Sequence, residues 1–384
     1  MSRPTAKGWC PGAYQPMLSG DGLVVRIRPI LARLTRAQAL GLCGLAQRYG
    51  SGIIDVTSRA NIQLRGVDAA QHDTLLTALV DLDLLPDDPA IEARRNILVA
   101  PDWPEGGLTE RLARQLITRL TDLPALPAKF GFSIEADAAP MLGDASADLR
   151  IERAGSGLIL RAEGCATGRA VTEANAIDQL IALAHWFAGS GGQDAKRMAR
   201  HLTTTELPPE WQGDAPLKPR APLAAGLSPG GTAYGVAFGQ INAAALADLI
   251  EKSACRALRV TPWRLIVTED AAPLADPPPG LLTQESDPLR RLHACPGAPF
   301  CASATVQTHA LARRMAQAPQ LPGGRLHISG CAKGCAHPRR AGTTLVGHDG
   351  RFDLVRDGLP WDDPDDRGLT DTEILTRLSE TGAL

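Results

Sequence analysis

The 384-residue chain predicts an α+β protein whose architecture is duplicated. Two observations carry this prediction. A strand, a helix, a strand, a turn and a strand follow one another over residues 23–66, and the same order recurs over residues 235–268. A pair of strands joined by a polar turn is expected over residues 148–164 and again over 344–358. Since both kinds of unit recur in the same order, an internal duplication is favoured over a chance likeness of short α/β units.

The first unit contains a helix with clear start and stop signals. Thr35 and Gln38 form a capping box, and apolar residues at helical spacing continue from there until Gly50. The strands of this unit are expected at Leu23–Ile27, Ile53–Val56 and Ile62–Leu64.

The second unit follows the same order. Asn242 is the expected cap of a helix at Leu246–Cys255. The strands are expected at Gly235–Phe238, Ala257–Val260 and Leu265–Val267. Proline-rich segments at 207–222 and 276–280 predict linkers on either side of this unit.

Four cysteines near the C-terminus carry the chemistry. Cys295 and Cys301 enclose five residues, and Cys331 and Cys335 enclose three. Thiolates in close pairs, with Gly and Pro to bend the backbone, suit a [4Fe–4S] cluster that takes one thiolate per iron. A structural zinc site and unligated thiols are the alternatives, but the first gap is longer than the two to four residues usual in zinc knuckles.

These motifs also carry a family resemblance. The segments CPGAPFC (295–301) and SGCAKGCAHP (329–338) resemble the cluster motif of the nitrite/sulfite reductase superfamily, in which the last cysteine also bridges to a sirohaem iron. Within it, CPG (10–12), TSRANIQLRG (57–66) and TPWR (261–264) resemble the precorrin-3B synthase branch. The resemblance extends over most of residues 8–360.

The resemblance implies a duplicated nitrite/sulfite reductase-like fold, made of ferredoxin-like half-domains and two α/β lobes. The half-domains would be residues 1–80 and 226–275. A lobe without cluster ligands would be 90–205, and the [4Fe–4S]-binding lobe would be 281–384.

The resemblance also implies an activity. The chain would be an iron–sulfur monooxygenase of aerobic cobalamin biosynthesis. It would hydroxylate precorrin-3A at C20 with O2 and close a lactone, using the cluster and a mononuclear non-haem iron whose ligands the sequence does not identify. A sirohaem-dependent sulfite or nitrite reductase is the alternative function. A non-enzymatic electron carrier or zinc-stabilised module would leave the duplicated scaffold and the basic loops unexplained.

Basic residues are the candidates for binding an anionic macrocycle, since a guanidinium binds a carboxylate in bidentate fashion. By resemblance, Arg59, Arg95 and Lys129 form the catalytic patch over the macrocycle, although each alone would fit a solvated surface charge. Further candidate substrate ligands are Arg26, Arg65, Arg264 and Lys333. For Arg26 a salt bridge at a strand edge is an equal alternative.

Four positions qualify this assignment. Arg264 is expected to correspond to Arg59, and Lys333 and His337 could tune the cluster through charge and hydrogen bonds. Sulfite reductases have a second basic residue two positions after the lysine, where this chain has Gly131. Reduction of a small anion needs a dense cationic patch, so Gly131 favours a larger substrate with its own carboxylates.

Composition sets the remaining expectations. A net charge of −2 gives no reason to expect nucleic acid or a membrane surface as partner. The chain has no apolar run of 18 residues and no secretory signal, so we expect a cytoplasmic protein with reduced thiols. No flavin or nicotinamide motif is present, so an external reductase or ferredoxin would supply electrons. Cys43 and Cys255 are expected in the core, and Cys10 and Cys165 have no assigned role.

Overall fold

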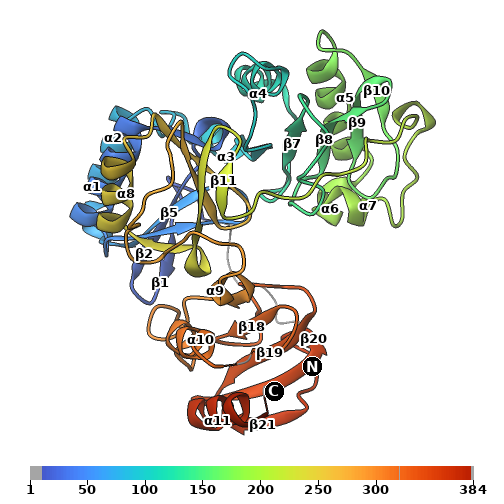
Figure 1. Cartoon of the computed structure of the whole chain (residues 1–384). Coiled ribbons are helices and arrows are strands. Elements are labelled where there is room, and N and C mark those ends of the chain that lie inside the picture. Colours follow the sequence, from blue (N-terminus) through green and yellow to red (C-terminus); the bar gives the residue numbers. More distant parts are fainter. Residues whose placement is uncertain (1–10, 320, 382–384) are drawn as a thin grey trace.

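The computed structural model of the protein describes residues 11–319 and 321–381. Two sheets form a central unit from the beginning and the middle of the chain, and two lobes extend from it in different directions (Figure 1). Cys10 lies outside the described residues. No described helix is long and apolar enough to cross a membrane.

The central unit contains one sheet from each duplicated half. The first sheet has the strand order β1 (Met17–Ser19), β2 (Gly22–Ile27), β5 (Ile62–Val67), β4 (Ile53–Val56), β13 (Gln240–Asn242). The second has the order β11 (Gly226–Ser228), β12 (Gly231–Val236), β15 (Leu265–Glu269), β14 (Ala257–Val260), β3 (Arg33–Thr35), and β16 (Leu281–Leu282) also pairs with β12. The helices are α1 (Arg36–Tyr49), α2 (His72–Asp81), α3 (Pro89–Arg94) and α8 (Ala243–Ser253).

The two halves exchange edge strands. Strand β13 of the second half pairs with β4, where Ile241 lies opposite Ile54. Strand β3 of the first half pairs with β14, where Leu34 lies opposite Leu258. Helices α1 and α8 pack against each other, so both halves share one apolar core. This exchange explains why the halves form a single unit.

Each half also inserts one residue into a lobe. Leu31 (φ 53°) and Phe238 (φ 59°) occupy corresponding left-handed turns after β2 and β12. Leu31 is buried in the core of the first lobe, and Phe238 packs against the core of the second. The prediction of a strand at Phe238 is therefore wrong, because the chain turns there to dock the lobe.

The first lobe has a sheet of the order β10 (Arg169–Val171), β9 (Gly157–Ala162), β8 (Leu149–Ala154), β7 (Phe132–Glu135), β6 (Ile97–Val99). The pairs β6–β7 and β7–β8 are parallel, and the pairs β8–β9 and β9–β10 are antiparallel. Its helices are α4 (Leu108–Thr118), α5 (Ala176–Gly189), α6 (Gly192–Ala195) and α7 (Met198–His201).

The second lobe repeats this topology. Its sheet has the order β17 (Leu292–Ala294), β18 (Leu326–Ser329), β19 (Ala341–His348), β20 (Arg351–Gly358), β21 (Asp366–Leu369). Two parallel pairs are again followed by two antiparallel pairs. The helices are α9 (Pro288–Arg291), α10 (Thr308–Ala316) and α11 (Asp371–Thr381). The shared order and directions confirm the duplication.

The order of the strands shows which loops of the two lobes correspond. The Lys129 loop precedes β7, whereas the second cysteine pair follows β18, so these two loops do not correspond. The segment that corresponds to Cys331 and Cys335 is residues 136–148, between β7 and β8. Strand β7 separates the Lys129 loop from the β8–β9 hairpin.

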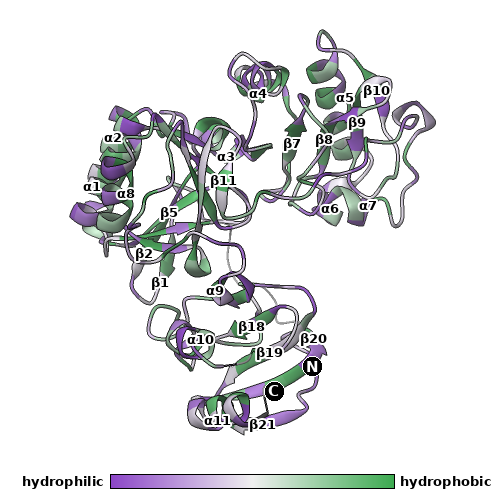
Figure 2. Cartoon of the chain, in the orientation of Figure 1, coloured by the Kyte–Doolittle hydropathy of each residue, from purple (hydrophilic) through white to green (hydrophobic). Residues whose placement is uncertain are grey.

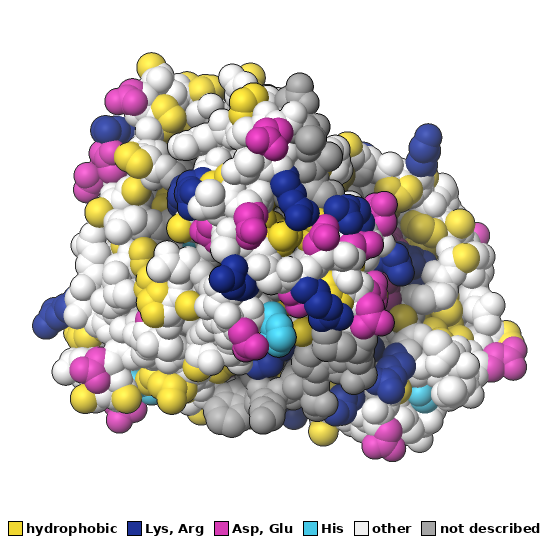
Figure 3. Space-filling view, turned by 90° about the horizontal axis from the view of Figure 1, so that it is seen from below, with side chains coloured by type: hydrophobic (Ala, Val, Ile, Leu, Met, Phe, Trp, Pro, Cys, Tyr) yellow, Lys and Arg dark blue, Asp and Glu magenta, His cyan; other side chains and the backbone are white. Residues whose placement is uncertain are grey.

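The local signals in the sequence were read correctly at most elements. Thr35 and Gln38 form the predicted capping box, α1 ends before Gly50, and the Asn242 side chain caps α8. Apolar colour follows inner strands such as β7, and polar colour marks surface helices such as α4 (Figure 2). The underside of the molecule has acidic and basic side chains side by side (Figure 3). The limits of the four predicted segments stay a prediction.

Candidate functional site

The four cysteines lie in loops that follow two neighbouring parallel strands. Cys295 follows β17, and Cys331 follows β18 after Gly330. Because the carboxyl ends of parallel strands meet at one edge, these loops come together. Burial raises the pKa of Cys335, and the charges of the other three thiols raise it further. All four thiols are free, and they lie within electrostatic reach of one another.

The surroundings of Cys295 fit an iron–sulfur cluster. The amide of Gly330 donates to Cys295 Sγ at 3.1 Å, a contact typical of cluster thiolates. The Thr308 hydroxyl, at the start of α10, donates to the carbonyl of Cys295. Gly297 has φ 68°, and a Cβ there would lie 2.6 Å from Thr308 Oγ1. The loop therefore requires glycine to bend around the thiol.

Lys333 lies in the loop between Cys331 and Cys335. Its Nζ donates to Ser303 Oγ at 2.9 Å, and its charge favours the thiolate of Cys335. Across residues 11–319 and 321–381, no three His, Cys, Asp or Glu side chains converge on a point where they could hold a single metal ion. Four thiolates are the donor set that a [4Fe–4S] cluster takes. No ligand set for a mononuclear iron is present in this part of the chain.

The first cysteine loop is fastened to the central unit. The carbonyl of Phe300 accepts hydrogen bonds from Ser19 Oγ at 2.6 Å and from the amide of Gly20 at 3.2 Å. Arg65 Nη2 donates to the same carbonyl at 3.3 Å. These bonds fix the loop between Cys295 and Cys301 against the β1–β2 hairpin.

The proposed substrate role of Arg65 does not agree with this placement. Its side chain is 6% exposed and forms ion pairs with Asp21 at 2.9 Å and Asp55 at 3.2 Å. A guanidinium with two carboxylate partners is already neutralised, so Arg65 holds the cysteine loop rather than a substrate. The sequence could not show this because Asp21 lies in the β1–β2 turn and Asp55 lies on β4.

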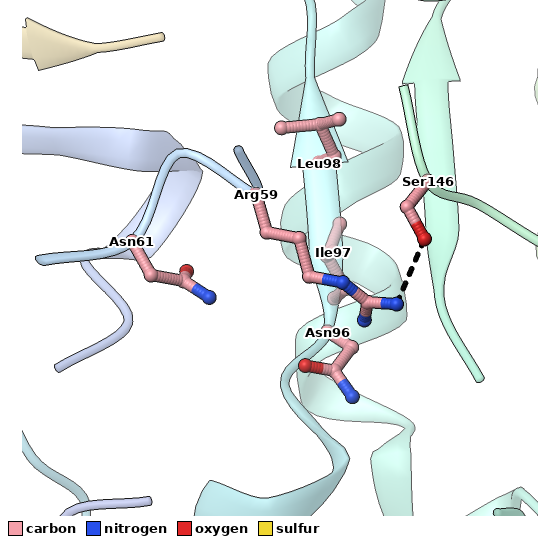
Figure 4. Close-up of a pocket in the computed structure, with 6 residues that line it drawn as sticks. All are labelled: Arg59, Asn61, Asn96, Ile97, Leu98 and Ser146. Carbon is pink, nitrogen blue, oxygen red and sulfur yellow. Dashed lines mark hydrogen bonds between the residues drawn. The ribbon is translucent and has the colours of Figure 1, made fainter. Parts of the chain in front are cut away.

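A small recess lies between the central unit and the first lobe. Arg59 extends from the β4–β5 turn across the start of β6, and its Nη2 donates to Ser146 Oγ at 2.8 Å (Figure 4). The same Nη2 donates to the carbonyl of Lys129 at 2.8 Å, while the Lys129 side chain is exposed. The structure therefore brings Arg59 and the Lys129 loop together as predicted. The recess is lined by Arg59, Asn61, Asn96, Ile97, Leu98 and Ser146.

Arg95 lies beside this recess. Its guanidinium donates to the carbonyl of Arg28, and burial lowers its pKa. Arg28 is itself buried in an ion pair with Glu92. Asn96, which the sequence analysis missed, donates to the carbonyls of Ala128 and Phe130, each at 3.1 Å, and so fixes the Lys129 loop.

The expected equivalence of Arg264 and Arg59 is wrong. Thr57 Oγ1 accepts from the amides of Arg59 and Asn61, and Thr261 Oγ1 accepts from those of Trp263 and Leu265. Arg59 therefore corresponds to Trp263, and Arg264 corresponds to Ala60. Arg264 and Ala60 both have a left-handed backbone conformation, with φ 58° and 52°. The two turns have the same length, so the expected pairing of Arg264 with Arg59 was displaced by one residue.

The other predicted basic residues lie on separate elements. Arg264 faces the second lobe, where its Nη1 donates to the carbonyl of Leu292 at 3.1 Å. Arg26, on β2, donates to the side-chain oxygen of Gln63 at 2.9 Å once that amide is flipped. These residues do not share the recess of Arg59.

A loop held by two buried ionisable side chains, Glu135 and Arg150, connects the recess to the second lobe. Glu135 accepts from the amides of Met141 and Leu142, the nearest at 2.7 Å. Arg150, 0% exposed, donates to the carbonyls of Leu142, Gly143 and Ala145. On the outer side, Ser146 binds Arg59, and the carbonyl of Asp144 accepts from Arg339 at 2.9 Å. Sequence analysis missed this loop because it has no motif.

Comparisons with known proteins agree with this architecture. The model of the nitrite/sulfite reductase ferredoxin-like half domain matches residues 15–82. The NirA protein of Mycobacterium tuberculosis superimposes with a TM-score of 0.64 at 18% identity, over 93% of this chain and 79% of NirA. The fold is therefore that of the nitrite and sulfite reductases.

A curated relative defines the branch. A precorrin-3B synthase of Sinorhizobium sp is 32% identical, over 94% of this chain and 86% of the relative. The chain belongs to the precorrin-3B synthase family, a family of enzymes.

Proposed function

We propose that this protein is a precorrin-3B synthase that hydroxylates precorrin-3A at C20 with O2 and closes a lactone with the ring A acetate. The observation that carries the proposal is the relation to the Sinorhizobium synthase at 32% identity along 94% of the chain. The reaction inserts one oxygen atom of O2 into the substrate and reduces the other to water, so an external donor must supply two electrons.

The recess of Arg59 supports a substrate with its own carboxylates. Arg59 and Arg95 present guanidiniums at one junction of the central unit and the first lobe, and Lys129 adds an exposed ammonium. In a partly dehydrated junction, such donors bind carboxylates more strongly than in water. These three residues would hold the rim of the macrocycle and orient one face of it.

Gly131 argues against the alternative function, sulfite or nitrite reduction. A Cβ at Gly131 would lie 3.2 Å from the carbonyl of Asn96 and 3.6 Å from Arg59 Nη1. A lysine there would lie in contact with the guanidinium of Arg59 and would require the Asn96 carbonyl to shift by a few tenths of an ångström. The recess thus lacks the dense positive charge that a small anion needs. Sirohaem remains part of this alternative reading only.

The cluster cysteines would take part in electron supply. Cys295, Cys301, Cys331 and Cys335 would hold a [4Fe–4S] cluster, which when bound passes single electrons. The Gly330 amide and the Lys333 ammonium stabilise thiolate charge there. We derive no step through a mononuclear iron, because the described residues do not converge to hold one. A reductase or ferredoxin in the cytoplasm would be the electron donor.

The test combines a spectrum and a labelled turnover. Anaerobically purified protein should show a broad absorption at the blue edge of the visible range without a sirohaem Soret band. With an electron donor and labelled O2, it should convert precorrin-3A to a product heavier by one labelled oxygen. Rapid reduction of sulfite or nitrite with precorrin-3A unchanged would establish the reductase instead.

The role of the recess can be tested separately. Losing one charge-assisted bond should cost roughly 1.5–3 kcal/mol, so Arg59→Ala and Arg95→Ala should lower kcat/KM for precorrin-3A about ten- to a hundredfold. Arg36 is a poor control because its guanidinium donates to the carbonyl of Ile250. Arg48→Ala, on the exposed end of α1, should leave turnover unchanged at equal iron content. Parent-like turnover in all variants would place the substrate elsewhere.

A further inference from the structure

Apolar side chains are exposed beside the first cysteine loop. Phe300, the residue before Cys301, is 47% exposed, and Leu18 and Met17 on β1 are 77% and 39% exposed. Strand β1 forms one edge of the first sheet, on the side of the central unit that faces the second lobe (Figure 1). Exposed apolar side chains that gather in one patch mark a surface that binds another protein.

Contacts between the β1–β2 hairpin and the cysteine loop bring these residues together. The Phe300 carbonyl accepts hydrogen bonds from Ser19 Oγ at 2.6 Å and from the Gly20 amide at 3.2 Å. A Cβ at Gly20 would lie 2.3 Å from the carbonyl oxygen of Pro299, so any other residue would force the two backbones apart. The backbones thus meet, while the Phe300 and Leu18 side chains stay exposed.

The segment that carries the cysteines is positively charged. Residues 288–348 contain no Asp or Glu, although the whole chain has 42 among its 384 residues. The Lys and Arg residues of this segment are Arg290, Arg291, Arg313, Arg314, Arg325, Lys333, Arg339 and Arg340. Arg290, Arg314 and Arg340 pair with carboxylates, and the other five have no ion pair with a described residue.

Most acidic side chains of the second lobe lie away from the first cysteine loop. They follow residue 348, in the segment that contains β20, β21 and α11. Strands β20 and β21 lie at the opposite end of the sheet from β17, which the first cysteine loop follows. In the β1–β2 hairpin, the one acid, Asp21, is 11% exposed and pairs with Arg65 at 2.9 Å. The apolar patch therefore adjoins a positive segment and has no free carboxylate of its own.

We infer that Met17, Leu18 and Phe300 form the docking surface of an acidic one-electron carrier protein. This inference rests on the proposed function, which needs two electrons from an external donor. In each encounter the reduced carrier would lose one electron to the cluster, so two encounters supply the reaction. An apolar centre with charged surroundings is the usual composition of a protein interface, and opposite charge speeds the encounter. A second copy of this chain is disfavoured as occupant, since it would present the same positive segment.

The test measures binding of an acidic [2Fe–2S] ferredoxin to the cluster-loaded protein by titration calorimetry. Phe300→Ser and Leu18→Ser should each weaken binding about tenfold, because a few residues at the centre of an interface carry most of its binding energy. Serine at position 300 retains the backbone carbonyl and its hydrogen bonds, so the cysteine loop keeps its support. Leu227→Ser is the matched control, since Leu227 is 81% exposed at the corresponding position of β11. It should bind within twofold of the parent.

Two further measurements separate docking from damage to the cluster. Reduced ferredoxin below saturation should reduce the cluster of Phe300→Ser about tenfold more slowly than that of the parent, whereas dithionite, which needs no docking surface, should reduce both at the same rate. Ferredoxin binding should weaken as the salt concentration rises, and Lys333→Gln should flatten this dependence. Lys252→Gln, on α8, is the control and should follow the parent. Basic cytochrome c should bind about tenfold more weakly than ferredoxin, or less.

The outcomes distinguish this inference from the proposed function. Parent-like binding of ferredoxin by both Phe300→Ser and Leu18→Ser would place the carrier elsewhere. Equal or tighter binding of cytochrome c would exclude an acidic partner. Either result overturns the docking surface, and the proposed function stands if the parent converts precorrin-3A with a chemical electron donor. No conversion with any donor would overturn the proposed function, whereas weaker binding by the two variants would still support the surface.

Discussion

The four clustered cysteines differ in burial, yet a cluster needs a thiolate from each. Cys295 is 9% exposed, whereas the side chain of Cys335 reaches the surface. Replacing Cys331 with Ser removes one ligand, so we expect loss of cluster iron and sulfide and a less stable second lobe. Iron and acid-labile sulfide per chain, with the visible spectrum, are the measurements. Full cluster content in Cys331→Ser would remove Cys331 from the ligand set.

The matched control for that substitution is Cys43 in the core of the central unit. It is 1% exposed, and burial raises the pKa of its thiol to about 12, so it acts as a small neutral apolar group. Cys43→Ser should retain the cluster and lower the free energy of unfolding by on the order of 1 kcal/mol.

Glu135 gives the first lobe a dependence on pH. Burial raises the pKa of its carboxyl from 4.5 to about 7, against the effect of the Met141 and Leu142 amides. The unfolded chain therefore loses this proton at a lower pH than the folded protein. The protonated carboxyl therefore contributes fully to the free energy of unfolding below about pH 4.5. This contribution, on the order of 3 kcal/mol, is lost as the pH rises to about 7.

We predict that in Glu135→Gln the free energy of unfolding depends less steeply on pH. The free energy of unfolding of the first lobe, measured in urea between pH 4.5 and 7, should fall less than in the parent. Glu210→Gln, on an exposed turn, should follow the parent curve. Identical curves for Glu135→Gln and the parent would show that this carboxyl titrates normally.

At the scale of elements, residues 141–147 form a hydrogen-bonded loop at the place where the second lobe has the second cysteine pair. Arg150→Met should leave the carbonyls of Leu142, Gly143 and Ala145 without their donor and destabilise the first lobe by about 3 kcal/mol. Amide exchange of the loop should accelerate, while cluster content should stay unchanged. Arg153→Met, on the same strand, is the control. Slow exchange in Arg150→Met would mean that Glu135 alone holds the loop.

The sequence predicted those elements whose signals are local. Strands β4 and β14 begin and end at the predicted residues. Each is a short run of mostly apolar residues that is bounded by polar turns, and its apolar side chains are largely buried. The site was harder to predict. Arg65 has the sequence signature of a substrate ligand, yet its role depends on Asp21 and Asp55, which meet it only in the sheet. The Glu135 and Arg150 clamp depends on backbone groups, which no residue pattern encodes.

At the scale of the whole molecule, the exchange of β3 and β13 joins the two halves of the central unit. Without β13, strand β4 would end the first sheet with its backbone groups exposed. Without β3, strand β14 would end the second sheet in the same way. Helix α1 would also lose its apolar partner α8. Neither half thus has a complete core.

The last prediction follows from this shared core. Residues 11–88 and 221–284, produced separately, should each lack dispersed amide signals in NMR spectra, because each fragment leaves a sheet edge and an apolar helix face uncovered. Mixing them in equal amounts should restore a dispersed spectrum and a single unfolding transition whose midpoint depends on concentration. Ile241→Lys in the second fragment should prevent this association, since Ile241 is 2% exposed opposite Ile54. Leu227→Lys, at a position 81% exposed on β11, should not. A folded monomer of residues 11–88 alone would show that the first half is independent of β13.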